Sequence, residues 1–525
     1  MKQLLLFILW SSFLLGDAYK ILVLNPKFSY SHVQFVGKIA EILVEDGNEV
    51  VQLVIEMDYS IKTNGTEKSK NVLYRGTESV IKRLSKSSNH LDAWKTEPGS
   101  IEQIDLIMDI IESNRDVGTQ MIYDKDLSNW IKEQKFDMAV SEVFNTYAFG
   151  IFKSWDIETT IAVSAIPLVE TYRKWYGMGY PASYIPGINM NFNDKMTYSE
   201  RFQNYLNFII LRVLFEFDKT YNYAAMLKEV YPDRDIDHEY EVGEVSFLFL
   251  NTHPYLDFPQ TLPPKIQEIG GIAIPEKKPL SKEWDDILNK RKINVLLSFG
   301  TVVQTKNMPS NIRANIINTF LSFKDVTFIW KVDKTDVDVG KEYDNIIMSS
   351  WIPQSDLLAD ERLYLFITHC GLNSFMELTH HGKVALAIPF LADQFRNSQL
   401  LKKGGSGRAV DKKTLENGEE FINIIRDMLQ NSEYKKKALR IQEMIKSRPL
   451  GPKEVFLKHI EIAKKFKKLP ELDLGSRDMN FIQYYNYDVI LPIILLISFI
   501  IYAIIIAIKK TICIFFNFKS KSKIE

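Results

Sequence analysis

The stretch from Trp351 to Gln399 reads WIPQSDLLADERLYLFITHCGLNSFMELTHHGKVALAIPFLADQFRNSQ, and it decides the fold. An apolar strand over 363–367 runs into the small polar turn 368–371, and a helix is predicted from about Asn373 to Gly382. Polar residues stand at the carboxyl ends of the two strands that come before and after this helix. Ligands of open α/β sheets bind outside the carboxyl ends of the strands, and a helix N-terminus offers free N–H groups to a pyrophosphate. The stretch therefore predicts an anion or nucleotide pocket.

The length of 525 residues suffices for two α/β domains. The formal net charge of −1 gives no reason to expect nucleic acid or another polyanion as a partner. The composition shifts at a segment rich in proline and lysine, residues 275–281. We predict an N-terminal acceptor-binding domain over 19–274, a linker over 275–281 and a C-terminal domain over 282–470.

Both ends of the chain carry targeting signals. Residues 1–18 combine Lys2, an apolar run and small residues before a cleavage point, which indicates a signal peptide; the alternative is a first buried strand. Residues 489–508 contain no charge and are long enough to span a bilayer as one helix. The basic tail over 509–525 then lies in the cytosol and the bulk of the chain in the lumen. The ending KSKIE resembles a dilysine retrieval signal of the endoplasmic reticulum, or it is only a positive cluster.

Three smaller features constrain the chemistry. Asn64 opens an N-x-T sequon in a polar stretch and is a predicted glycosylation site. Cys370 and Cys513 are expected on opposite sides of the membrane boundary, so no intrachain disulfide is expected. No cluster of His, Asp and Glu has metal-ligand spacing, so neither a metal nor a cofactor is expected, and His380-His381 is interpreted as a cationic helix C-terminus.

The first domain opens with a strand, a helix and a second strand over 19–56, which predicts a parallel sheet without the glycine fingerprint of a dinucleotide fold. His32 follows the first strand, and Glu142 ends the strand over 136–142. By position alone each is either a site residue or an ordinary capping or surface residue. Residues 58–100 are expected to form loops and short helices, and the loop over 166–198 suits the lining of an apolar acceptor site.

The motifs of the opening stretch carry a family resemblance. W-x-P-Q-x-D-L-L at 351–358, T-H-x-G-x-N-S-x-x-E at 368–377 and D-Q at 393–394 resemble the signature of the UDP-glycosyltransferases, and in particular their membrane-anchored animal UDP-glucuronosyltransferase branch. S-F-G-T at 298–301, the signal peptide and the membrane helix extend the resemblance over nearly the whole chain. It implies an α/β fold of GT-B type, with two doubly wound parallel-sheet domains facing a cleft, plus one C-terminal transmembrane helix.

The resemblance also implies which residues bind the UDP-sugar donor. Trp351 is expected to stack on uracil, although a core aromatic is the alternative. Gln354 is expected to bond the edge of the base, and Glu377 to accept bonds from the ribose. The residues expected at or near the diphosphate are Thr301, His369, Gly371, Asn373 and Ser374. Asp393 and Gln394 are expected to hold the hydroxyls of the sugar.

His32 resembles the catalytic base of the family, and Glu142 stands where the family commonly has Asp. An imidazole of near-neutral pKa suits removal of the acceptor's proton, and a carboxylate on its other nitrogen would fix the tautomer. The expected reaction is metal-independent transfer of a hexosyl group, glucuronic acid or glucose, to small lipophilic acceptors with inversion. The expected location is the endoplasmic reticulum membrane, as a single-pass type I protein.

Two departures from the family pattern leave alternatives open. Glu142 is one methylene longer than Asp, and Cys370 replaces a glycine, which is unfavourable if that position needs a positive φ. The Cys370 thiol suggests sensitivity to thiol reagents. Together they motivate a second reading, a catalytically impaired UDP-sugar-binding paralogue with a regulatory role; a receptor or adhesion ectodomain leaves the motifs unexplained. The sequence leaves open whether Arg396 faces the sugar or solvent. It also leaves open the identity of the donor and the acceptor, and whether the chain forms a homo- or hetero-oligomer.

Overall fold

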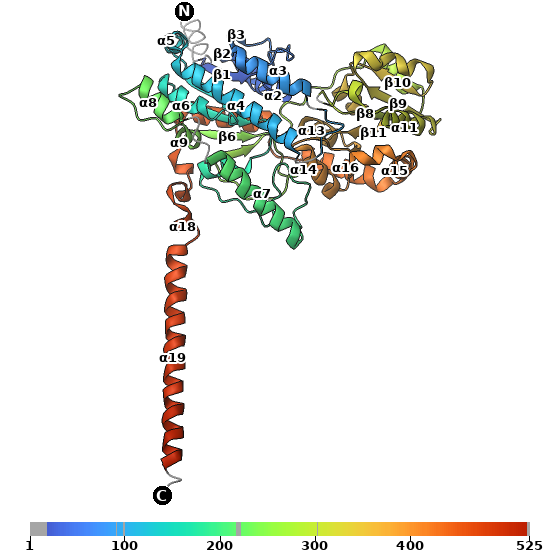
Figure 1. Cartoon of the computed structure of the whole chain (residues 1–525). Helices are drawn as coiled ribbons and strands as arrows, with labels where there is room; N and C mark the ends of the chain where they lie inside the picture. Colours follow the sequence, from blue (N-terminus) through green and yellow to red (C-terminus); the bar gives the residue numbers. More distant parts are fainter. Residues whose placement is uncertain (1–17, 91, 98–99, 217–221, 302, 522–525) are drawn as a thin grey trace, which may run out of the picture.

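The computed structural model describes residues 18–90, 92–97, 100–216, 222–301 and 303–521. Apart from residue 18, the predicted signal peptide lies outside this range, as do the last four residues of the predicted cytosolic tail. Within it, two lobes lie side by side, and one long helix projects from the first lobe (Figure 1).

The first lobe is built on a seven-stranded parallel sheet with the strand order β3-β2-β1-β4-β5-β6-β7. Its strands are β1 (Lys20–Pro26), β2 (Glu49–Glu56), β3 (Lys70–Arg75), β4 (Met138–Glu142), β5 (Thr159–Ser164), β6 (Phe247–Leu250) and β7 (Ile266–Glu268). Its helices are α2 (Tyr30–Glu45), α3 (Glu78–His90), α4 (Ile101–Tyr123), α5 (Lys125–Gln134), α6 (Tyr147–Ser154), η1 (Glu170–Tyr176), α7 (Tyr198–Glu216), α8 (Tyr223–Val230) and α9 (His238–Gly243). Alternate residues of β1 enter different cores: Leu22 and Leu24 pack on one face, Ile21 and Val23 on the other. A sheet covered on both faces requires the continuous apolar runs that the sequence shows.

The second lobe has a six-stranded parallel sheet with the order β10-β9-β8-β11-β12-β13. Its strands are β8 (Ile293–Ser298), β9 (Val326–Lys331), β10 (Ile346–Ser349), β11 (Leu363–Thr368), β12 (Val384–Ala387) and β13 (Gly407–Ala409). Its helices are α10 (Lys282–Asn289), η2 (Thr305–Asn307), α11 (Ser310–Leu321), η3 (Lys334–Glu342), α12 (Gln354–Ala359), α13 (Leu372–His380), α14 (Gln394–Gly404), η4 (Lys412–Glu416), α15 (Gly418–Gln430) and α16 (Ser432–Lys446). The two doubly wound parallel sheets confirm the predicted fold class.

The expectation of only loops and short helices over 58–100 is wrong in one respect. Strand β3 forms the edge of the first sheet at residues 70–75. Its side chains are mostly half-buried or exposed, so the segment lacks the apolar run that marks the central strands. Pairing with β2, rather than local hydrophobicity, makes this segment a strand.

Each lobe receives in its core a segment that belongs to the other lobe by sequence. Helix α17 (Pro452–Phe466) follows the second domain in sequence, but Phe456 and Ile460 join the core beneath the first sheet. In the other direction, Trp94 packs in the core of the second domain, where its ring lies 5.0 Å from that of Phe390, and its Nε1 donates to the carbonyl of Gln304. Both crossings bury apolar surface between the lobes, which stabilises their relative position.

The C-terminal region leaves the first lobe through η5 (Pro470–Leu472), η6 (Gly475–Asp478) and α18 (Phe481–Tyr484), and it ends in α19 (Tyr487–Lys521). Residues 487–514 of α19 are long and apolar enough to cross a membrane, and none of the apolar window is buried against the protein. The helix includes the predicted span 489–508 and extends beyond it at both ends. Figure 1 shows α19 projecting away from both lobes.

Candidate active site

His32 and Glu142 meet at the carboxyl edge of the first sheet. His32 lies in the first turn of α2, directly after β1, and Glu142 is the last residue of β4, which pairs with β1. The order of the sheet reverses between these two strands, which is the place where such sheets bind ligands. Nδ1 of His32 lies 2.8 Å from each carboxylate oxygen of Glu142, and the backbone N–H of Ala165 donates to the same carboxylate at 3.0 Å.

This pair is shielded but not closed off. The Glu142 side chain is 1% exposed and the His32 side chain 13%. The ring of Phe28 lies 4.7 Å from the imidazole and that of Phe144 6.2 Å away. Burial by itself would lower the pKa of His32, but the Glu142 carboxylate, with a smaller effect of Asp393, raises it above its ordinary value. The extra methylene of Glu142 therefore does not prevent a two-oxygen contact with the imidazole.

In the second sheet the strand order reverses between β8 and β11, and His369 directly follows β11 at this place. Gly300 has φ +75°, and a Cβ there would lie 2.7 Å from the imidazole; a Cβ on Gly371 would lie 2.8 Å from it. Only glycine lets both backbones approach the ring this closely. Burial, followed by the nearby charge of Lys331, lowers the pKa of His369 to about 4, so the ring is neutral at pH 7.

Lys331 was not singled out from the sequence. It is the last residue of β9, and its Nζ donates to the carbonyl of Gly300 at 2.8 Å. Burial lowers its pKa, while the charge of Asp333 raises it. The signal available in the sequence was a lone cation at the carboxyl end of an apolar strand. The structure places that cation beside the turn that surrounds His369.

Cys370 adopts φ +63°, the left-handed conformation that would favour glycine. Its side chain is fully buried, and Asn397 Nδ2 donates to its carbonyl at 3.1 Å. Burial, with a smaller effect of Asp393, raises the pKa of the thiol, so it stays protonated and out of reach of reagents. Burial argues against the suggested thiol sensitivity of the site, which stays a prediction.

Three of the predicted donor residues, Gln354, Ser374 and Glu377, form one connected group. Gln354 Nε2 donates to Ser374 Oγ at 3.2 Å and to Glu377 Oε2 at 2.6 Å. Burial raises the pKa of Glu377 to about 7, although the bond from Gln354 lowers it. Trp351 next to this group is 69% exposed, so it is not a core aromatic. Its ring offers an open face at the edge of the site.

Asp393 and Gln394, the two residues predicted to hold the sugar, lie at the start of α14. Asn397 Nδ2 donates to Asp393 Oδ2 at 2.7 Å, and the backbone N–H of Leu372 also donates to this half-buried carboxylate. Gln394 is buried, and its Oε1 accepts from the backbone N–H groups of Phe390 and Leu391. The Gln394 oxygen therefore shapes the loop, and only its amide nitrogen remains for a sugar hydroxyl.

Contacts between the lobes bring the two halves of the site together. Asn251, one residue after β6, points Nδ2 to Oδ1 of Asn373 in α13 at 3.4 Å. Asp393 of the second lobe lies near enough to His32 for the charge of each group to shift the pKa of the other. Thr301 is exposed after the turn at Gly300. The donor and base roles of the predicted residues stay predictions.

The comparisons with known proteins agree with this geometry. Residues 19–524 match the sequence profile described as UDP-glucoronosyl and UDP-glucosyl transferase. The chain belongs to this UDP-glycosyltransferase family. A putative UDP-glucuronosyltransferase of Caenorhabditis elegans, ugt-47, is 27% identical over 91% of this chain and 90% of that protein. The human UDP-glucuronosyltransferase 2B7 is 24% identical over 97% of the chain and 95% of its own length.

Solved structures support the fold of this UDP-glycosyltransferase. Phytolacca americana UGT2, in complex with UDP-2-fluoro-glucose and pterostilbene, superposes with a TM-score of 0.56 at 14% identity, covering 85% of this chain and 100% of that one. The spinosyn forosaminyltransferase SpnP gives a TM-score of 0.55 at 14% identity, covering 85% and 99%. The predicted family and the predicted GT-B architecture are therefore confirmed.

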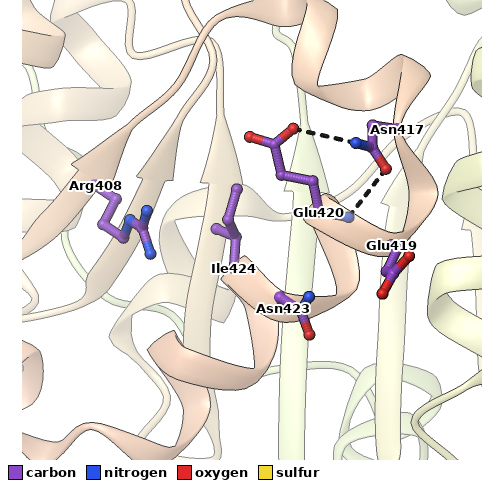
Figure 2. A pocket seen from close by; sticks show the side chains of 6 residues that line it. All are labelled: Arg408, Asn417, Glu419, Glu420, Asn423 and Ile424. Atoms are coloured by element: carbon purple, nitrogen blue, oxygen red, sulfur yellow. Dashed lines mark hydrogen bonds between the residues drawn. The ribbon is translucent and has the colours of Figure 1, made fainter.

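Three further residues or regions of this UDP-glycosyltransferase lie away from the site. A cavity of about 440 Å³ opens at the start of α15, lined by side chains that include Arg408 and Glu420 (Figure 2). It shares no residue with the predicted donor or base residues. Asn64 is half-buried in a loop whose backbone accepts from Gln52, and its glycosylation stays a prediction. His380-His381 is not a cationic helix end, because burial lowers the pKa of both rings, that of His381 to about 4.

Proposed function

We propose that this UDP-glycosyltransferase transfers glucuronic acid or glucose from a UDP-sugar to a hydroxyl of small lipophilic acceptors, with inversion and with His32 as the base. The observation that carries the proposal is the pair of 2.8 Å contacts between His32 Nδ1 and Glu142. They fix the tautomer that leaves Nε2 as an acceptor for the substrate proton.

The proposed step is one displacement. The acceptor O–H gives its proton to Nε2 of His32 while the oxygen attacks the anomeric carbon. The bond from that carbon to the UDP oxygen breaks, and UDP leaves with the electron pair. The imidazolium that forms is stabilised by the buried Glu142 carboxylate. Attack opposite the leaving group converts an α-linked donor into a β-glycoside.

The second lobe supplies the groups that stabilise the leaving diphosphate. The N-terminus of α13, which begins directly after Gly371, offers backbone N–H groups and the positive end of the helix dipole. The ring of His369 lies beside this helix start, and the Lys331 cation lies at the adjacent Gly300 turn. Dipoles fixed before the reaction need no reorganisation as charge develops on the UDP oxygen. In this proposal Trp351, Gln354 and Glu377 hold the uridine, and Asp393 and Gln394 hold the sugar.

Donor choice and location are proposed from the similar proteins and from the ends of the chain. The similar proteins of nematodes and humans carry the name UDP-glucuronosyltransferase, which favours glucuronate. Arg396, the cation nearest to Asp393-Gln394 in sequence, is buried in an ion pair with Asp257, so its charge is not offered to a sugar carboxylate. The apolar helix α19 supports a membrane anchor. An endoplasmic reticulum location with a lumenal site is proposed from the two targeting signals alone.

The alternative of an impaired sugar-binding paralogue rested on Glu142 and Cys370. Glu142 contacts the imidazole with both oxygens, and Cys370 accepts the left-handed backbone that the turn needs. Neither departure removes a group from the proposed reaction. These observations favour the enzyme over the regulatory paralogue.

The test is release of UDP by membranes containing the full chain, with UDP-glucuronate and UDP-glucose side by side and a panel of phenols and sterols. The expected result is acceptor-dependent release that falls at least about 100-fold in His32→Ala. Equal release by the variant would overturn the role of His32. Binding of UDP-sugar without turnover of any acceptor would favour the regulatory paralogue instead.

A further inference from the structure

Helix α7 turns its apolar side chains outward. Residues spaced by three and four along this helix share one face, and six of them are between 45% and 78% exposed. They are Tyr198, Phe202, Tyr205, Leu206, Ile210 and Val213. A surface helix of a water-exposed domain normally buries this stripe and exposes its polar face.

The opposite face of α7 is attached to the lobe through a polar residue. Asn204 is fully buried; its Nδ2 donates to the carbonyls of Ala182 and Ile185 at 2.8 Å, and its Oδ1 accepts from the N–H of Gly187 at 2.8 Å. Beside it, the ring of Phe208 lies 4.8 Å from that of Tyr180. The inner contacts of α7 therefore leave its apolar stripe without cover among the residues that the structure describes.

The loop over residues 177–187, which Asn204 contacts, also contacts the segment that precedes the membrane helix. The N–H of Gly179 donates to the hydroxyl of Tyr484 at 2.8 Å, and Ser476 Oγ donates to the carbonyl of Gly177 at 2.7 Å. Partial burial is the largest cause of the raised pKa of the Tyr485 phenol, and Tyr205 of α7 is among the neighbours that add to it. In Figure 1, α7 lies on the side of the first lobe from which α19 projects.

We propose that the outer face of α7 lies in the boundary layer of the same bilayer that α19 crosses, as a second membrane contact. The position of the bilayer surface is set by α19, which begins three residues after Tyr484. Tyr and Phe are the side chains that favour the boundary between headgroups and acyl chains. Arg201 is exposed beside Tyr198 of the stripe, with its guanidinium 6.0 Å from that ring, where it suits anionic headgroups.

This contact would restrict how the lobe rotates about the anchor. A cavity of about 400 Å³ lies between the loop at Tyr180 and Tyr184 and the pre-membrane residues Tyr484 and Tyr485. With α7 in the boundary layer, this cavity is held next to the bilayer. Compounds that partition into lipid then reach the lobe without crossing bulk water.

The test uses the full chain with Cys513→Ser, so that the buried Cys370 is the only native thiol. Single cysteines at Phe202→Cys and Ile210→Cys are labelled with an environment-sensitive fluorophore, and the chain is placed in nanodiscs that contain lipid with a nitroxide near the headgroup. The matched control is Ser79→Cys, an exposed position in the first turn of α3. We expect at least about threefold stronger quenching at 202 and 210 than at 79. Equal quenching at all three positions would overturn the proposal.

A second arm separates lipid from protein partners. In Phe202→Glu/Ile210→Glu, a label at Leu206→Cys is expected to lose most of its quenching while thermal unfolding and resistance to alkaline extraction stay unchanged. Cross-linking between copies through Phe202→Cys, without quenching by the nitroxide lipid, would show a second copy on this face. That result would overturn a bilayer contact.

Discussion

Arg396 of the second domain and Asp257 of the first form a buried ion pair, with 2.5 Å between Nη2 and Oδ1 and side chains 4% and 7% exposed. The guanidinium also lies over the ring of Phe258 at 4.9 Å. Arg396 is three residues from Asp393, so this pair joins the domains next to the proposed sugar subsite.

Removing one member of this pair should destabilise the protein more than removing both. Asp257→Leu or Arg396→Met leaves an unpaired group in a buried interface and is expected to cost about 3–5 kcal/mol. The double variant Asp257→Leu/Arg396→Met should recover much of that loss. Denaturant unfolding of the four proteins measures the coupling, and additive losses would contradict it.

The rate should depend on pH through His32. Its raised pKa means that the base is protonated, and inactive, up to a pH above 6.5, so kcat/KM should rise with pH through an apparent pKa above that value. Glu142→Gln removes the main cause of the increase and leaves the burial, so the transition should move to lower pH while the plateau falls by about 10²- to 10⁴-fold.

The same shift affects stability with a definite sign. A pKa raised by folding contributes stability that is fully present below pH 6.5 and is lost as the pH rises through the folded value. The unfolding free energy of the wild type should therefore exceed that of Glu142→Gln by a larger margin at acidic pH than at alkaline pH. A difference that is constant with pH would contradict the charged pair.

Trp351→Ala should weaken donor binding without unfolding the protein. The ring is 69% exposed, so little packing is lost, whereas stacking of an aromatic on a base is worth about 1–3 kcal/mol. We expect KM for the UDP-sugar to rise about 5- to 150-fold, with kcat and the unfolding midpoint near wild type. Trp351→Phe, which keeps a stacking face, should retain most of the affinity.

Lys331→Met should disturb the turn at Gly300 by removing the bond from Nζ to its carbonyl. Because the nearby charge helps to lower the pKa of His369, the variant should also raise that pKa from about 4 towards its ordinary value. Titration of the His369 ring by NMR measures this directly, beside the KM for the donor. Lys331→Arg, which keeps the charge, should leave the His369 pKa low.

Alkylation of the native protein should modify Cys513 and spare Cys370. Cys370 is fully buried and its thiol is protonated, while Cys513 is exposed on α19. Mass spectrometry before and after denaturation distinguishes the two sites, and the transferase rate in detergent should survive modification of Cys513 alone. Rapid loss of activity with modified Cys370 would contradict the buried geometry of the turn.

The sequence by itself determined the central strands, the family and the donor turn. These depend on local signals: apolar runs, a glycine-containing turn before a helix, and a spaced signature over 351–397 that few other folds would need. The family resemblance also predicted that His32 and Glu142 meet, although 110 residues separate them, because Glu142 stands where the family commonly has the acid partner of the base. The edge strand β3 escaped prediction because its side chains are only partly buried.

Only the tertiary structure decided the states of the buried groups. Whether Arg396 faces solvent or Asp257, whether His369 is charged, and whether Cys370 is reactive depend on what packs against each group from distant segments. Likewise, the sequence does not show that Lys331 lies at the Gly300 turn. Nor does it show that α7 lies on the side of the first lobe from which α19 projects. The physical reason is that desolvation and long-range charge act through space, so the residues that set a pKa or cover a helix face need not be neighbours in sequence.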